Sequence, residues 1–173
     1  MIPSALRNIE LKVHYPDLAV VPERLRGLTF IDDGARTQID TYFQAPRGRL
    51  KLREEDGRPA ILIAYARPTE AGYRTSNYRL IPISDPAALK AGLEETVGLR
   101  GIVKKRRQVF LWENVRIHLD EVVGLGNFIE FEAVLSSDAD EAISNKRLDE
   151  LCRRLGIDSS KTIAGSYSDL LGI

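Results

Sequence analysis

Charged side chains that alternate with apolar ones are the residues of this sequence best placed to do chemistry. Residues two positions apart in a strand point to the same face. Arg49, Lys51 and Arg53 therefore share one face, and Glu130 and Glu132 share a face in a later stretch. One stretch thus presents only cations and the other only carboxylates, although like charges on one face repel. This sorting of charge indicates a ligand that binds between the two sets.

A polyanion bound together with a divalent metal would satisfy both sets. Arginine offers forked donors to phosphate and lysine a compact charge, while Mg²⁺ and Mn²⁺ select carboxylate oxygens and retain phosphate oxygens as further ligands. Phosphoryl and nucleotidyl transfer depend mainly on positioning and on neutralising charge at the phosphate oxygens. The pattern therefore predicts a metal-dependent triphosphate site; for any single strand, the alternative is an ordinary solvated face.

Other stretches also carry polar residues at alternating positions. Two of them are clear from the sequence: Glu10 with Lys12, and Arg116 with His118 and Asp120. In the run 103–107 (VKKRR) the alternation leaves two choices for the polar face, Lys104 with Arg106 or Lys105 with Arg107.

The elements that must position these residues are mostly strands. Alternation and β-branched or aromatic residues predict strands at 6–15, 36–44, 47–54, 58–68, 73–82, 101–112, 114–121 and 127–135. Helices are predicted at 18–28, from Asp85-Pro86 to about Gly98, and at 138–155 with Asp138 as its cap, and the last residues suit a short docking helix.

Hairpin turns between these stretches set the expected architecture. Asp56-Gly57 joins two alternating runs, which is a strong hairpin signal. Repeated antiparallel hairpins with one polar face predict a mainly β (α+β) fold, an antiparallel closed β-barrel of about eight strands with short flanking helices, because closure removes exposed edges. At 173 residues, the chain is expected to form a single domain over 1–173.

Composition narrows the class of protein. Lys+Arg and Asp+Glu are both 25, and this balance argues against a nucleic-acid partner. Cys152 is the single cysteine, which excludes an internal disulfide or a cysteine-rich metal site. The sequence has no GxxxxGK[ST] loop, no serine hydrolase elbow and no apolar run long enough for a signal peptide or membrane span. A cytoplasmic protein without membrane partners is therefore expected.

In order along the chain, the motifs resemble the CYTH family, also called triphosphate tunnel metalloenzymes. This family includes class IV adenylyl cyclases, thiamine triphosphatases and inorganic triphosphatases. The stretch NIELK at 8–12 is similar to the family's ExExK strand, and the later stretches that carry the resemblance are QIDTYF (38–43), GRLKLRE (48–54), VKKRR (103–107), RIHLDEV (116–122) and GLGNFIEFE (124–132). The family's K-x-R pattern, followed by an aromatic residue that is Phe110 here, favours Lys105 with Arg107 as the inward pair.

The resemblance implies a role for each matching residue and Mg²⁺ or Mn²⁺ as the cofactor. The implied metal ligands are Glu10, Glu130 and Glu132, with Asp120 at the metal or orienting a cation. The implied phosphate-binding cations are Lys12, Arg49, Lys51, Arg53, Lys105 and Arg107, with Arg74 as a further cation near the substrate. Glu10, Lys12 and Asp120 are the expected catalytic residues.

One position departs from the family pattern. Asn8 stands where the first glutamate of ExExK is expected. An amide oxygen can ligate Mg²⁺ but carries no negative charge, so one metal position should be weakened or lost.

Two ring-bearing side chains near the charged residues are interpreted as structural. For His118, between Arg116 and Asp120, a hydrogen-bonding role is favoured over catalysis. Tyr65 is interpreted as a packing aromatic, the alternative being a position that lines the barrel lumen.

The expected activity is that of a class IV adenylyl-cyclase-like enzyme, which converts ATP to cyclic AMP and pyrophosphate. The alternative is hydrolysis of thiamine triphosphate or inorganic tripolyphosphate at the same site. A further alternative is a non-catalytic module that binds nucleotides or polyphosphate, and a homodimer is left open. A lipid carrier barrel is disfavoured because such carriers have apolar cavities.

Overall fold

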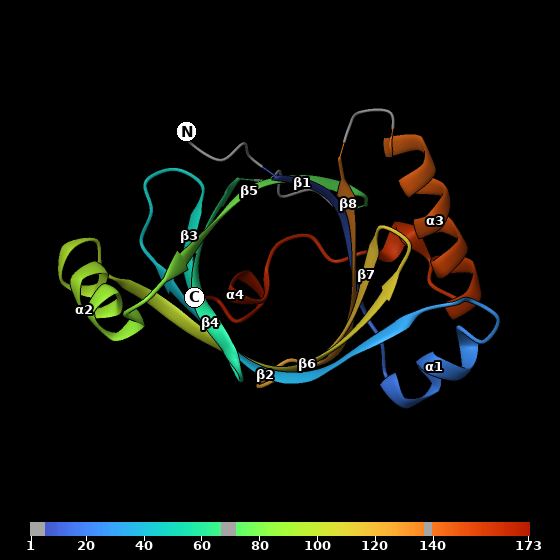
Figure 1. Ribbon diagram of the computed structural model, residues 1–173, viewed down its shortest axis with the longest axis horizontal. Helices are drawn as coiled ribbons and strands as arrows, with labels where there is room; N and C mark the ends of the chain where they lie inside the picture. Colours follow the sequence, from blue (N-terminus) through green and yellow to red (C-terminus); the bar gives the residue numbers. More distant parts are fainter. Residues whose placement is uncertain (1–5, 67–71, 137–139) are drawn as a thin grey trace.

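Eight antiparallel strands form a closed barrel in the computed structural model, which describes residues 6–66, 72–136 and 140–173 (Figure 1). The order around the barrel is β1-β5-β4-β3-β2-β6-β7-β8. The strands are β1 (Leu6–His14), β2 (Ile31–Phe43), β3 (Arg49–Glu55), β4 (Arg58–Ala66), β5 (Arg74–Ile83), β6 (Leu99–Trp112), β7 (Val115–Val122) and β8 (Gly126–Leu135). The closed eight-stranded barrel expected from the sequence is confirmed.

The pairing register of the strands brings the polar positions onto one inner face. Asp40 of β2 lies opposite Arg53 of β3, and Lys105 of β6 lies opposite Val122 of β7. His118 of β7 lies opposite Glu130 of β8. Side chains alternate along every strand, so the residues two positions before and after each paired residue point to the same face as that residue. Distant stretches of the chain therefore meet inside the barrel.

Two helices cover the outside of the barrel on opposite sides (Figure 1). The strand β5 leads into α2 (Pro86–Thr96), which is capped by Asp85 and packs Leu89 and Leu93 against the barrel. The helix α3 (Asp140–Leu155) buries Leu148 and Leu151 against the outward-facing residues of β1, β7 and β8. These apolar contacts hold the strands that carry the inner polar groups.

Two local predictions differ from the structure in extent. The stretch 18–28 forms only a 3₁₀ turn, η1 (Leu18–Val20), and the short helix α1 (Val21–Arg24), and Gly27 with φ of 93° terminates the helical turn. The strand β2 begins at Ile31 rather than at 36, because it pairs with the long β6 through a bulge at Gly34. The predicted cap at Asp138 lies outside the described residues.

The C-terminal segment enters the barrel. After the 3₁₀ turn η2 (Ser159–Lys161), the helix α4 (Tyr167–Leu170) lies within the ring of strands (Figure 1). Tyr167 packs with four inward-facing apolar side chains at one end of the barrel: Tyr42, Val103, Val122 and Phe128. Leu171 and Ile173 pack against the same cluster. The segment therefore fills one end of the interior and leaves a cavity in the remainder of the barrel.

Candidate active site

All eight strands contribute side chains to a cavity of about 560 Å³ inside the barrel. The order of strands divides its wall into three sectors. The cationic sector comprises Lys51 and Arg53 of β3 and Lys105 and Arg107 of β6, the acidic sector comprises Glu130 and Glu132 of β8 and Glu10 of β1 beside His118 of β7, and β4 and β5 contribute mainly apolar side chains. The structure therefore brings the two charged sets onto different walls of one cavity.

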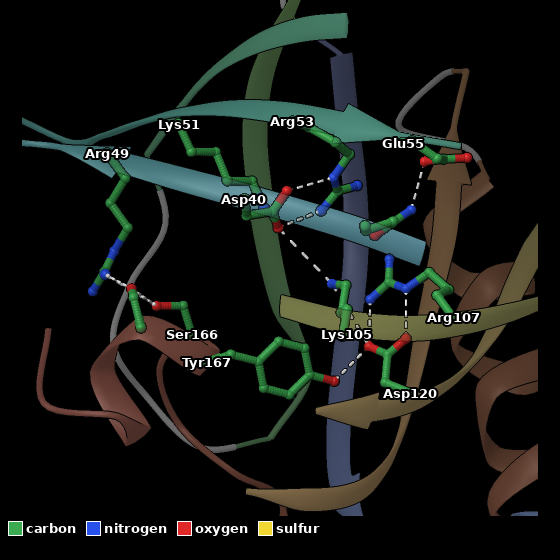
Figure 2. A network of polar contacts seen from close by, with 12 residues as sticks. Asp40, Arg49, Lys51, Arg53, Glu55, Lys105, Arg107, Asp120, Ser166 and Tyr167 are labelled. Atoms are coloured by element: carbon green, nitrogen blue, oxygen red, sulfur yellow. Dashed lines mark hydrogen bonds and ion pairs between the residues drawn. The ribbon is translucent and has the colours of Figure 1, made fainter. Parts of the chain in front are cut away.

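A single buried carboxylate organises the cationic sector. Asp40 accepts hydrogen bonds from Lys51 Nζ at 2.9 Å and from Arg53 Nε and Nη2 at 2.7 and 2.8 Å, as Figure 2 shows. The Nζ of Lys105 lies 3.9 Å from the same carboxylate. Sequence reasoning missed Asp40, although it lies within the QIDTYF motif. Its position indicates that it holds three cations together.

The protonation of this group follows from burial and charge. Burial acts to raise the pKa of Asp40, but the charges of Arg53 and Lys51 outweigh it and hold that pKa well below its ordinary value. Burial and the charge of Arg107 lower the pKa of Lys105 to about 7. Asp40 is therefore ionised at neutral pH, whereas the pKa of Lys105 lies near neutrality.

Arg107 links the cationic and acidic sectors. It donates two hydrogen bonds to Asp120, at 2.6 and 2.5 Å, and one to Glu130 at 2.7 Å. Asp120 also accepts a hydrogen bond of 2.6 Å from the Tyr167 hydroxyl. These bonds use both oxygens of Asp120, which therefore holds Arg107 in a fixed orientation. Lys104 and Arg106, in contrast, are exposed outside the barrel.

Tyr167 connects the C-terminal helix to the charged residues of the cavity (Figure 2). Its ring centroid lies 3.9 Å from Lys12 Nζ and 4.9 Å from Lys105 Nζ, both within range of a cation–π contact. Burial and the charge of Asp120 raise the pKa of its hydroxyl well above the ordinary value, which keeps it a donor. No local sequence signal predicted this contact, because it depends on the path of residues 159–173.

The acidic sector presents a group of potential metal ligands. Within the described residues, His118, Glu130 and Glu132 offer ligand atoms that all lie within 4.8 Å of one another. Burial acts to raise the pKa of Glu130. The charge of Lys12, and the contacts of Glu130 with His118 and Arg107, outweigh burial and hold this pKa well below the ordinary value. Burial and the charge of Arg107 lower the pKa of His118, which leaves its imidazole neutral at neutral pH.

The first strand contributes three more side chains to this wall. Asn8, Glu10 and Lys12 line the cavity, and Glu10 lies opposite Glu132 in the pairing of β1 with β8. Lys12 forms an ion pair of 3.3 Å with Glu130. The amide oxygen of Asn8 is buried and has no hydrogen-bond partner. The group of close ligand atoms includes neither Glu10 nor Asp120.

Two of the expected phosphate-binding cations hold the C-terminal segment instead of lining the cavity. Arg49 donates to the Ser166 hydroxyl at 3.1 Å and forms an ion pair of 2.7 Å with Asp169. The buried Arg74 donates to the carbonyl oxygen of Gly165 at 3.4 Å. Cations that the sequence did not single out for phosphate binding line the cavity as well: Arg36, Arg58 and Arg116.

Comparison with known proteins decides the family. The CYTH domain family matches residues 6–167, nearly the whole chain. The chain belongs to the CYTH family. A protein of Methanocaldococcus jannaschii named "Putative adenylate cyclase" is 25% identical over 176 residues, which cover 96% of this chain and 99% of that protein.

Solved structures show the same fold. The PH1819 protein of Pyrococcus horikoshii is 25% identical with a TM-score of 0.74, covering 95% of this chain and 97% of that chain. A structure from Vibrio parahaemolyticus, described as that of a "putative adenylate cyclase", is 19% identical with a TM-score of 0.78 and covers 99% of this chain and 100% of that chain. None of the helices in the described residues is long and apolar enough to cross a membrane.

The residues of this CYTH barrel fit the divalent metal and triphosphate that the family binds. Glu130 and Glu132 offer ionised oxygens on one wall, and the neutral His118 offers a nitrogen beside them. Carboxylate oxygens suit Mg²⁺ and Mn²⁺. Facing them, the basic groups of β3 and β6 match a chain of phosphate oxygens.

Removing the charge of Asp40 should destabilise the barrel in a way that phosphate reverses. We expect Asp40→Asn to lower the free energy of unfolding by about 3 kcal/mol, the order found when a buried ion pair is broken. Saturating tripolyphosphate should stabilise this variant more than the wild type, because its oxygens replace the missing negative charge. Denaturant unfolding with and without tripolyphosphate measures both effects. Glu95→Gln, which removes an exposed charge on α2, is the control. Equal stabilisation of Asp40→Asn and the wild type by tripolyphosphate would contradict this role.

The pKa of Lys105 predicts that phosphate binding weakens above neutral pH. Lys105 is charged below its pKa of about 7 and neutral above it. Bound phosphate favours the charged form, so from about pH 7 towards 10.5, the ordinary lysine value, binding takes up a proton. Isothermal titration with tripolyphosphate, without metal, should show the Kd rising with pH by up to about tenfold per unit. Lys105→Arg, which stays charged, should show a flatter profile. Parallel profiles for the two proteins would exclude Lys105 as the titrating group.

Proposed function

We propose that this protein is a metal-dependent adenylyl cyclase of the class IV type, which converts ATP to cyclic AMP and pyrophosphate. The observation that carries the proposal is the arrangement of one cavity wall of cations facing one of carboxylates. Membership of the CYTH family and the name of the Methanocaldococcus jannaschii relative support it.

In this proposal the cationic sector holds the triphosphate. Lys51, Arg53 and Lys105 exchange their shared contact with Asp40 for phosphate oxygens, and Arg107 stays oriented by Asp120. Each charged hydrogen bond contributes about 1.5–3 kcal/mol. A divalent ion held by Glu130 and Glu132, with Glu10 beside them, would neutralise phosphate oxygens and lower the pKa of an attacking hydroxyl.

The apolar sector favours a substrate with an organic group. Tyr65 lies opposite Tyr78, and Ile63 opposite Leu80, in the pairing of β4 with β5. All four side chains line the cavity, so the lumen position of Tyr65 is correct rather than the packing role. Inorganic tripolyphosphate has no group to bury against such a wall, whereas the adenine base of ATP does. Lys51 Nζ lies 5.8 Å from the Tyr65 ring, so this surface begins beside the phosphate-binding cations.

The proposed reaction is an internal displacement. The ribose 3′-oxygen attacks the α-phosphorus as its hydroxyl proton passes to water or to a phosphate oxygen of the substrate. The bond from that phosphorus to the bridging oxygen breaks, and pyrophosphate leaves with the electron pair. Lys51, Arg53 and Arg107 would neutralise the charge that develops on the leaving pyrophosphate. The cavity walls hold the base and the phosphates, which limits the ribose to few orientations and reduces the entropic cost of the attack.

A product assay tests the proposed reaction. The purified protein is incubated with Mg²⁺ or Mn²⁺ and with ATP, thiamine triphosphate or tripolyphosphate, and the products are separated. We expect cyclic AMP and pyrophosphate from ATP, and we expect Glu132→Gln to lose at least about 100-fold in kcat while it remains folded. Glu121→Gln, with an exposed glutamate on β7, is the matched control. Orthophosphate as the product would replace cyclisation by hydrolysis, and triphosphate binding without turnover would indicate a binding module.

The apolar sector can be tested separately from the charges. Tyr65→Ser should weaken ATP binding by about 1–3 kcal/mol, the range for stacking of a base on an aromatic ring, because the base loses its contact. Tripolyphosphate should bind the variant and the wild type alike. Competitive binding of the two ligands measures this difference, and Tyr73→Phe, outside the cavity lining, serves as the control. An equal loss of affinity for both ligands would show that Tyr65 positions Lys51 rather than a base.

A further inference from the structure

The cavity contains a histidine whose ring nitrogen the proposed function does not use. His118 is 4% exposed and lines the cavity from β7. Its Nδ1 has no hydrogen-bond partner, although it lies 3.8 Å from Glu130 Oε2 and 3.9 Å from Glu132 Oε1. These separations are too long for hydrogen bonds. A buried polar atom without a partner is unfavourable, so its direction towards two carboxylates requires a cause.

The two separations from His118 Nδ1 suit a shared ion better than direct contact. Two atoms bonded to one divalent ion at about 2.0–2.2 Å lie at most about 4.4 Å apart. Both separations from His118 Nδ1 fall below this limit. A neutral imidazole offers one lone pair to a metal, and each carboxylate brings negative charge. The three side chains therefore have the composition of a metal site, and the two separations from the histidine nitrogen have the size of one.

The negative charge available to a metal in this part of the cavity is limited, which favours a nitrogen ligand. Asn8 lines the same cavity from β1 and supplies no negative charge there. Each carboxylate also forms an ion pair with an arginine: Glu132 with Arg116 at 3.5 Å and Glu130 with Arg107 at 2.7 Å. A site with fewer free carboxylate oxygens binds Mg²⁺ less well, whereas an imidazole nitrogen adds affinity mainly for transition metals.

We infer that His118 completes the metal site formed by Glu130 and Glu132, and that its nitrogen makes this site selective for transition metals over Mg²⁺. The inference rests on the proposed function in that the ion is the one bound beside the triphosphate. It assigns a ligand role to a residue for which the sequence suggested only hydrogen bonding. His118 thereby determines which ion the site retains.

Mn²⁺ alone is the probe for the test, without nucleotide. Electron spin-echo envelope modulation of bound Mn²⁺ detects an imidazole nitrogen that is directly coordinated. The chain has only two histidines, so the assignment needs one variant and one control. We expect imidazole modulation in the wild type and in His14→Gln, whose histidine is exposed. The modulation should be absent in His118→Gln.

Affinity gives a second readout that does not depend on turnover. Titration followed by the free Mn²⁺ signal should show at least about tenfold weaker binding to His118→Gln. Competition with Mg²⁺ should show its affinity changed by less than about threefold. Circular dichroism checks that the variant is folded; if it is not, the spectrum of His14→Gln, whose one remaining histidine is His118, decides the case.

Each outcome separates the inference from the function on which it rests. Mn²⁺ bound to the wild type without imidazole modulation would overturn the role of His118 and leave the triphosphate proposal intact. No binding of Mn²⁺ to the wild type would overturn the metal site itself. Cyclic AMP production without imidazole modulation would sustain the cyclase and reject the histidine ligand.

Discussion

Buried cations can be crowded inside this barrel only because buried carboxylates lie among them. Five cations take part in the inner network (Lys12, Lys51, Arg53, Lys105 and Arg107), and they share three carboxylates (Asp40, Asp120 and Glu130). Charges of one sign without such partners would meet a desolvation cost of several kcal/mol each. The carboxylates thus make the fold compatible with the site.

Lys105 shows where this compensation is incomplete. It lies 3.9 Å from Asp40 and 3.8 Å from Asp120, at the limit of an ion pair with either. Arg53 and Arg107, in contrast, each form close paired hydrogen bonds with one of these carboxylates. Lys105 is therefore the cation whose charged form is least stabilised in the free protein. Asp40 and Asp120 form their close hydrogen bonds with the two arginines and leave Lys105 without a close negative partner. A bound phosphate would supply that negative charge, so it would stabilise Lys105 more than the two arginines.

The sequence was sufficient for the barrel because the inner and outer faces differ along each strand. Polar residues alternate with apolar ones on β1, β3, β7 and β8, and this pattern fixes both the strand and its face. The start of β2 was missed because 31–35 (IDDGA) has no such alternation and becomes a strand only by pairing with β6. Helix caps such as Asp85 are local, so they were predictable.

Parts of the site could not be predicted because they depend on contacts between distant segments. Asp40 is one polar residue in a stretch of mixed residues, and its meaning appears only when β3 and β6 place three cations around it. Tyr167 reaches Lys12 and Asp120 from the other end of the chain. The pattern correctly assigned Arg49 to the inner face, but it could not show that Ser166 and Asp169 of the C-terminal segment occupy its guanidinium there.

The C-terminal segment also explains how the charged layer is kept out of water. On β6 the apolar Val103 comes two residues before Lys105, and on β8 Phe128 comes two residues before Glu130, so the apolar layer lies directly beside the charged one. Tyr167 packs on Val103 and Phe128. Because this end of the interior is filled with apolar side chains, the nearby charges act in a medium of low dielectric and are stronger than at a surface. The same packing that closes the barrel therefore sets the strength of the interactions available to a bound phosphate.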